Sequence, residues 1–76
     1  MKEVYGNLSG NSGIQAFEIG ATEIKVWFKG KRRPYVYNYI NPGADNVERM
    51  KSLAIEGVGL STYISQHVGR NYYKIG

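Results

Sequence analysis

Two neighbouring segments of the chain carry side chains that suit molecular recognition. One is a run in which tyrosine alternates with other residues, Tyr35-Val36-Tyr37-Asn38-Tyr39. The other is the densest basic cluster, Lys29-Gly30-Lys31-Arg32-Arg33, which comes just before it. Residues that alternate at period two share one face of a β-strand. The sequence therefore predicts tyrosine rings on one strand face beside a cationic turn, which suits a core wall, a nucleic-acid platform or a nucleotide pocket.

We expect some of these tyrosines to pack in the core and one to contact a ligand. We expect Tyr37 and Tyr39 to face the helices on the same side as Phe28, because tyrosine buries a large area and pairs well across strands. Core rings with hydroxyls at the periphery are the favoured interpretation, and direct ligand contact is the alternative. Tyr35 adjoins the basic loop, so we expect it to be the tyrosine that contacts a ligand.

Trp27 lies on the opposite strand face, between Lys25 and Lys29. An exposed tryptophan among cations can stack a base while lysines hold phosphates. The same ring suits a dimer contact. In a third interpretation the N-terminal segment folds back and covers the ring through Tyr5 or Leu8. Composition alone leaves all three open.

The basic loop concentrates four of the ten cations within five residues. Hairpin tips are exposed, and arginine suits bidentate phosphate contacts. A solvated run of charge is the alternative interpretation. Two further cations extend the patch if the C-terminal tail lies near this hairpin. The predicted nucleic-acid or ligand-binding residues are Trp27, Lys29, Lys31, Arg32, Arg33, Tyr35, Arg70 and Lys74.

Enzymatic chemistry is the class that the sequence favours least. His67 is the single histidine, and no acidic residue is obviously paired with it, so no catalytic residue is predicted. With one histidine and no cysteine, we expect no metal site. No phosphate-binding loop or nucleophile motif is present, and no cofactor is expected. The net charge of +4 favours an anionic partner, RNA or a nucleotide.

The elements that position these residues follow from the hydrophobic periodicity. The predicted strands are residues 14–19, 23–29 and 35–40, and the predicted helices are residues 45–56 and a shorter one capped by Ser61 and ended by Gly69. Residues 71–75 form a tail or a brief further strand. In the first strand the apolar residues fall on both parities, which indicates two covered faces or a β-bulge.

This order predicts an α+β domain. We expect a three-stranded antiparallel β-meander followed by two helices packed on one face, the face that carries Ile24, Val26 and Phe28. In the longer helix, Val47, Met50, Leu53 and Ala54 form the apolar stripe.

Chain length and composition indicate one small domain. Residues 1–12 are rich in Gly, Asn and Ser and predict a flexible N-terminal arm, and residues 13–76 form the domain. A chain of 76 residues buries a marginal core, so oligomerisation or a bound ligand would add stability. The sequence has no apolar run long enough for a membrane span, no signal peptide and no cysteine, so we expect a cytoplasmic protein.

Four segments resemble the KTSC domain, a small family named after a C-terminal extension of some lysyl-tRNA synthetases and also found as free-standing bacterial and phage proteins. They are Ser12-Gly13-Ile14, the alternating residues 24–28, Tyr37-Asn38-Tyr39 with its following Ile40-Asn41-Pro42, and residues 61–75. The resemblance spans about residues 12–75. The chain departs from the pattern in a shortened turn after the first strand, the extra basic run and the Gly57-Val58-Gly59 linker. The resemblance implies a compact α+β domain without catalytic residues and with an RNA-binding role.

Three functional hypotheses follow. The first is a small non-catalytic domain that binds RNA or single-stranded nucleic acid through the basic hairpin and aromatic side chains. The second is a homo-oligomer that sequesters a nucleotide or cyclic oligonucleotide signal, as a phage anti-defence protein would. The third is a protein-interaction module that uses the Trp27 face or a sheet edge.

Overall fold

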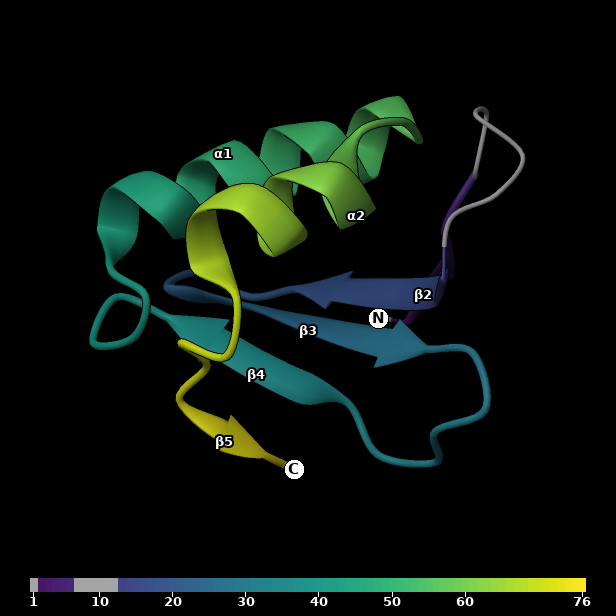
Figure 1. The fold of residues 1–76 in the computed structure, drawn as a ribbon, viewed down its shortest axis with the longest axis horizontal. Coiled ribbons are helices and arrows are strands. Elements are labelled where there is room, and N and C mark those ends of the chain that lie inside the picture. Colours follow the sequence, from purple (N-terminus) through teal and green to yellow (C-terminus); the bar gives the residue numbers. More distant parts are fainter. Residues whose placement is uncertain (1, 7–12) are drawn as a thin grey trace.

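The chain builds a two-layer fold in which helices cover one face of an antiparallel sheet (Figure 1). The computed structural model describes residues 2–6 and 13–76, and strands precede helices as predicted, which confirms the α+β fold. Within the described residues the elements are β1 (Glu3–Val4), β2 (Ile14–Ile19), β3 (Glu23–Phe28), β4 (Tyr35–Asn38), α1 (Ala44–Glu56), α2 (Leu60–Tyr63), the π-helix η1 (Ile64–Val68) and β5 (Lys74–Ile75).

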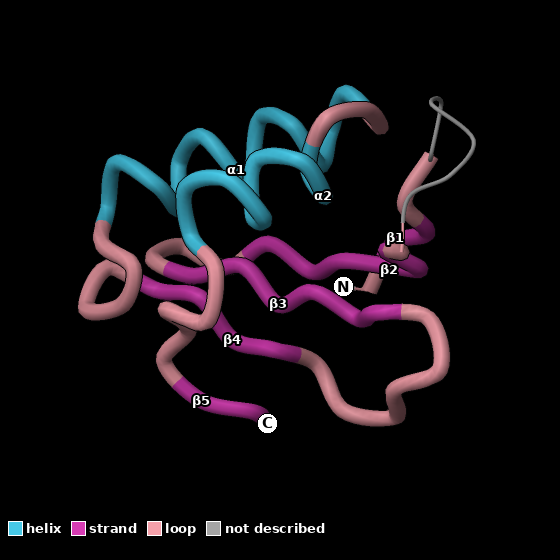
Figure 2. The backbone as a smooth tube through the Cα atoms, in the orientation of Figure 1, coloured by secondary structure: helices cyan, strands magenta, loops and turns pink. Residues whose placement is uncertain are grey.

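The sheet is a meander whose strand order follows the chain, from β1 to β5. The predicted three-stranded centre is present as β2, β3 and β4, and Figure 2 shows the short strands β1 and β5 at its two edges. The predicted C-terminal strand is also present, because Ile75 pairs with Tyr35 and Lys74 with Val36. The sheet therefore has five strands among the described residues, where the sequence predicted three or four.

The N-terminal residues that the structure describes pack onto the domain. Glu3 and Val4 pair with Phe17 and Ala16 of β2. Tyr5 is 4% exposed, and its hydroxyl accepts a hydrogen bond from the backbone N–H of Leu60 at 3.2 Å. Residues 2–6 thus contribute a strand and a core side chain. The rest of the predicted arm, residues 1 and 7–12, lies outside the described residues.

The Tyr5 hydroxyl has a measurable role in this fold. We expect Tyr5→Phe to lower the free energy of unfolding by about 1–2 kcal/mol, because it leaves the N–H at the start of α2 buried without its partner. Urea denaturation of both proteins measures the difference. Tyr73→Phe is the matched control, because Tyr73 is exposed, and it should leave the midpoint unchanged. Equal stability of Tyr5→Phe and wild type would contradict the docking of the N-terminal segment.

A β-bulge explains the mixed parity of the first predicted strand. Ile14 lies opposite Phe28 and Ala16 lies opposite Trp27, so the register shifts between them. The extra residue, Gln15, is exposed. The bulge lets Ile14 face the core at one end of the strand and Phe17 at the other, so the second of the two predicted alternatives is present.

The core lies between the helices and the sheet. Ile24 and Val26 of β3 are fully buried, as predicted from their alternation. The predicted helical stripe is confirmed, because the buried residues of α1 are Val47, Met50, Leu53 and Ala54. Gly57 ends α1 with a positive φ of 78°, and its N–H bonds to the carbonyls of Leu53 and Ala54.

The second helix differs from its prediction at its start. It begins at Leu60, so Ser61 lies inside the helix and the predicted serine cap is wrong. Gly59 takes the cap position with a φ of 84°, a value that glycine adopts without a steric penalty. After one α-helical turn the backbone widens into η1, which ends before Gly69 as predicted.

The strand that carries the tyrosines is two residues shorter than predicted. β4 ends at Asn38, whose side-chain oxygen accepts hydrogen bonds from the N–H groups of Ile40 and Asn41 at 3.0 Å. This local bonding turns the chain. Tyr37 is buried as predicted, at 1% exposure, but Tyr39 leaves the sheet and is 42% exposed. The expectation that Tyr39 faces the core beside Phe28 is wrong for that reason.

The displaced Tyr39 joins a polar cluster on α1. Its hydroxyl donates to Glu48 at 2.7 Å, and Lys51 Nζ lies 2.9 Å from the same carboxylate. Lys51 also donates to the carbonyl of Ala21 at 3.0 Å. The bond from Lys51, followed by that from Tyr39, lowers the pKa of Glu48 below its ordinary value of 4.5. The cluster thus ties α1 to the β2–β3 turn and to the turn after β4.

This lowered pKa predicts a pH-dependent contribution to stability. A carboxyl whose pKa is lower in the folded chain stabilises it above the unfolded pKa, and this contribution is lost as the pH falls through the folded value. Glu48→Gln should therefore lower the urea midpoint slightly near neutral pH, and the difference from wild type should vanish well below 4.5. Glu48 is exposed, so the effect is small. A difference that grows on acidification would contradict the assignment.

Candidate nucleic-acid interface

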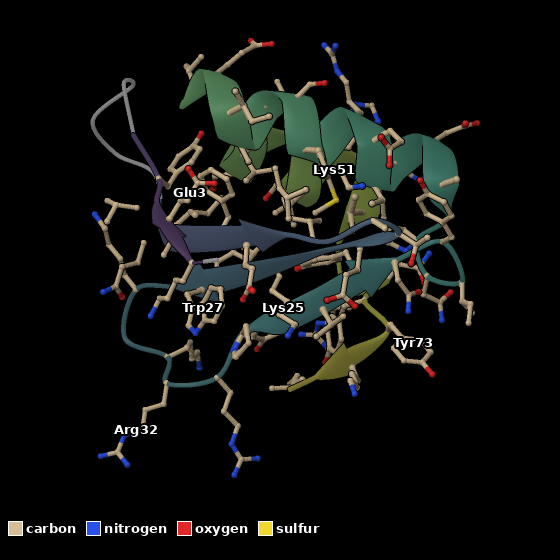
Figure 3. All side chains as sticks on the ribbon, turned by 180° about the vertical axis from the view of Figure 1, so that it is seen from behind. Glu3, Lys25, Trp27, Arg32, Lys51 and Tyr73 are labelled. Carbon is tan, nitrogen blue, oxygen red and sulfur yellow. The ribbon has the colours of Figure 1, made fainter. Side chains whose placement is uncertain are left out.

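The sheet face opposite the helices presents Trp27. Val26 is fully buried against the helix layer, so its neighbours Lys25 and Trp27 point the other way. Figure 3 shows both side chains extending from β3 away from the helices. We call this surface, with Ala16 of β2, Val36 of β4 and Lys74 of β5, the open face.

Cross-strand register arranges the open face in rows. Trp27 lies opposite Ala16, and Lys25 lies opposite Val36, which in turn pairs with Lys74. Ala16 and Val36 are each 2% exposed, whereas Trp27 is partly exposed. A tryptophan ring therefore stands on a small apolar floor with a lysine on either side of Val36.

One cation already contacts the tryptophan. Lys2 Nζ lies 4.6 Å from the Trp27 ring centroid, a cation–π distance. Tyr5, one of the two residues expected to cover Trp27, packs into the core instead. Leu8, the other, lies outside the described residues. Among the described N-terminal residues, Lys2 thus contacts Trp27 and adds charge to the open face.

The basic hairpin continues this surface beyond the end of β3. Lys31 N–H bonds to the Phe28 carbonyl at 3.1 Å, and Gly30 adopts the positive φ of 81° that this tight turn needs. All four cations of the loop are exposed, and none has an ion-pair partner among the described residues. Arg32 extends from the tip in Figure 3. These charges are free to meet an anionic ligand.

Tyr35 lies apart from Trp27. It pairs with Val26, so it sits on the helix side of the sheet. Its ring is half-buried in edge-to-face contacts with Phe28, at 5.2 Å, and Tyr72, at 4.8 Å. The two rings predicted to contact a ligand therefore lie on opposite faces, and Tyr35 contributes to packing beneath the hairpin.

The C-terminal tail brings one of its two predicted cations to the surface of interest. Gly76 N–H donates to the Pro34 carbonyl at 2.9 Å, so the chain ends at the base of the hairpin. Lys74 lies on the open face opposite Val36, where it extends the basic patch as predicted. Arg70 is exposed in the turn that leaves η1, before the tail reaches β4, and it is not brought to the open face.

The cations of the chain gather on the sheet layer, whereas its six acids divide equally between the strands and α1. Seven of the ten cations lie on the open face or its hairpin: Lys2, Lys25, Lys29, Lys31, Arg32, Arg33 and Lys74. Helix α1 holds three of the six acids: Asp45, Glu48 and Glu56. Glu18 and Glu23 lie at the far end of β2 and β3 from the hairpin, and Glu23 is 3.9 Å from Lys25. The positive field is therefore strongest around the hairpin and Trp27.

Comparison with known proteins gives no relative: no family model, curated protein or solved structure matches the chain. The KTSC resemblance thus stays a prediction from the sequence. Across the described residues, no helix has the length and apolar character to cross a membrane. The same residues contain no group of three or more acidic, histidine or cysteine side chains placed to hold a metal ion.

Sequence reasoning missed Lys2 as a member of this surface. Its position depends on β1, which pairs only two residues with β2. The signal present in the sequence was Val4-Tyr5, an apolar and aromatic pair in an otherwise polar segment. A two-residue edge strand is too short for periodicity to reveal.

Proposed function

We propose that this chain is a small non-catalytic domain that binds RNA or single-stranded nucleic acid on the open face. The observation that carries the proposal is Trp27, a partly exposed ring on the sheet face opposite the helices, with Lys2, Lys25 and the basic hairpin around it. Unstacked bases bind to aromatic side chains on sheets, and cations beside them hold the phosphates.

The arrangement assigns a role to each part. The indole of Trp27 stacks one base. Arg32 and Arg33 make bidentate contacts with backbone phosphates, because the guanidinium fork matches two phosphate oxygens. Lys2 lies against the ring in the free protein and moves to a neighbouring phosphate when a base takes its place. Lys74 extends the phosphate track along the face.

The KTSC resemblance supports the same class of partner, because that family implies an RNA-binding role. It also points to a bacterial or phage protein, and the absence of cysteine from the sequence fits the reducing cytoplasm. Tyr37-Asn38-Tyr39, the centre of the resemblance, then serves the fold: Tyr37 fills the core and Asn38 makes the turn. The proposed binding residues lie beside this segment.

A binding titration over a range of salt tests the proposal. A fluorescently labelled oligouridine of about 10 nucleotides suits a surface of this size. We expect saturable binding whose logarithm falls linearly with the logarithm of salt concentration, with a slope near −3 if four phosphates are neutralised. A duplex of the same length should bind less tightly, because its bases cannot reach Trp27. Absent binding, or affinity unchanged by salt, would overturn the proposal.

A further inference from the structure

A concave surface lies on the helix layer, away from the open face. It is a groove of about 310 Å³ between α1 and the α2–η1 segment, which run side by side in Figure 1. Its lining residues are Arg49, Leu53, Gly59, Thr62, Tyr63, Gln66 and His67. This volume lies at the lower end of the range for small-molecule sites, which is about 300–1,000 Å³.

One wall of the groove is a fixed pair of rings. Tyr63 and His67 lie 4.7 Å apart with an interplanar angle of 33°. The Tyr63 hydroxyl donates to Asn46 Oδ1 at 2.7 Å, and the Asn46 amide donates to the Pro42 carbonyl at 3.2 Å. The Tyr63 ring is therefore held in place from α1, and exposed His67 lies over it.

Helical spacing explains how these rings meet. Side chains four residues apart lie on one face of a helix. Tyr63 and His67 are one such pair, and Thr62 and Gln66 are the other. Single π-turns are frequent at functional sites. The α2–η1 segment thus lines the groove with one aromatic pair and one polar pair.

The opposite wall supplies a free positive charge. Arg49 is exposed on α1 and has no ion-pair partner among the described residues. The neighbouring carboxylate, Glu48, is engaged by Lys51 and Tyr39. An unpaired guanidinium beside hydroxyl and amide groups is suited to bind an oxyanion.

We infer that this groove binds a small ligand that joins a planar ring to an anionic group. The ring stacks on His67, Arg49 holds the phosphate or carboxylate, and Thr62 and Gln66 bond to polar atoms between them. The two parts of the site favour a ligand that carries both features over one that carries either alone. The inference is independent of nucleic-acid binding on the open face.

Adenosine monophosphate is a suitable probe, and its two halves, adenosine and inorganic phosphate, are its controls. In ¹H–¹⁵N spectra of the full chain, we expect saturable shifts of the amides of Thr62, Gln66 and His67. Adenosine monophosphate should bind about tenfold more tightly than either half, the difference expected from one charge-assisted hydrogen bond. No shift in the groove, shifts at Trp27 alone, or phosphate binding as tightly as the nucleotide would overturn the inference.

Two matched variants sharpen the test. Arg49→Gln should weaken nucleotide binding about tenfold or more, because it removes the charged donor. Arg70→Gln removes another exposed cation outside the groove and should leave binding unchanged. Both variants should keep the wild-type affinity for oligouridine, which separates this site from the open face. Unchanged nucleotide binding by Arg49→Gln, or an equal loss with Arg70→Gln, would contradict the inference that the groove binds the nucleotide.

Discussion

Trp27→Ala is expected to weaken binding of single-stranded RNA by about 5- to 150-fold, which corresponds to about 1–3 kcal/mol per stacked base. The ring is the large aromatic side chain on the open face, and two cations lie next to it, Lys2 in contact and Lys25 on the same strand. Its removal takes away the stacking surface and leaves the phosphate contacts. Affinity should therefore fall while the salt slope stays near its wild-type value.

Controls separate stacking from folding. Trp27 lies opposite the buried Ala16, so its loss exposes apolar surface and its effect on stability should be checked by thermal denaturation. Trp27→Phe keeps a ring and a cover, and it should retain most of the affinity. Tyr73→Ala removes an exposed ring that lies far from Trp27 along the sheet in Figure 3, and it should change nothing. Full RNA affinity in a folded Trp27→Ala protein would show that this ring does not stack a base.

Neutralising the basic hairpin is expected to reduce the salt slope. Each cation that contacts a phosphate contributes about −0.7 to the slope for a single strand. Replacing all four with glutamine, at positions 29, 31, 32 and 33, should therefore reduce its magnitude by about 1.4, the share of the two arginines that contact phosphates. The loop side chains are exposed and unpaired in the described residues, so stability should be unaffected.

A charge-conserving variant distinguishes arginine geometry from charge. The double variant Arg32→Lys and Arg33→Lys keeps the net charge but loses the bidentate fork. It should keep the salt slope and bind more weakly at every salt concentration. Arg70→Gln, which removes a cation away from the open face, should bind as wild type does. An unchanged slope after neutralisation of all four hairpin cations would remove the hairpin from the interface.

Elements whose apolar residues repeat at strand or helix spacing were predictable from the sequence. Ile24 and Val26 alternate with polar residues in β3, and the stripe of α1 repeats at helical spacing, so both buried faces follow directly. The position of Trp27 on the other face follows from the same parity. The exposed hairpin cations follow from the glycine that turns the chain.

Features set by single hydrogen bonds or by distant partners were not predictable. Asn38 ends β4 with its own side chain, and this moves Tyr39 from the sheet to α1. Tyr5 reaches the core through a bond to Leu60, 55 residues away. A contact between residues so far apart in the chain leaves no local pattern in the sequence.

The groove on the helix layer was also not predictable from the sequence. Arg49 lies on α1 and His67 on η1, and their meeting depends on how the two glycines of the linker turn the chain between the helices. The π-turn that continues α2 has no signature in the residue pattern. Only the three-dimensional arrangement brings these side chains to one surface.

The most direct test of the proposed function is ¹H–¹⁵N mapping of the labelled protein during titration with oligouridine. The open face as the RNA surface predicts the largest shifts at the Trp27 indole N–H, with further shifts at the amides of Lys25, Val36 and Lys74 and along the hairpin. The amides of α1 should remain unchanged. Shifts confined to the helix layer, or a Trp27 indole signal that does not move at saturation, would contradict it.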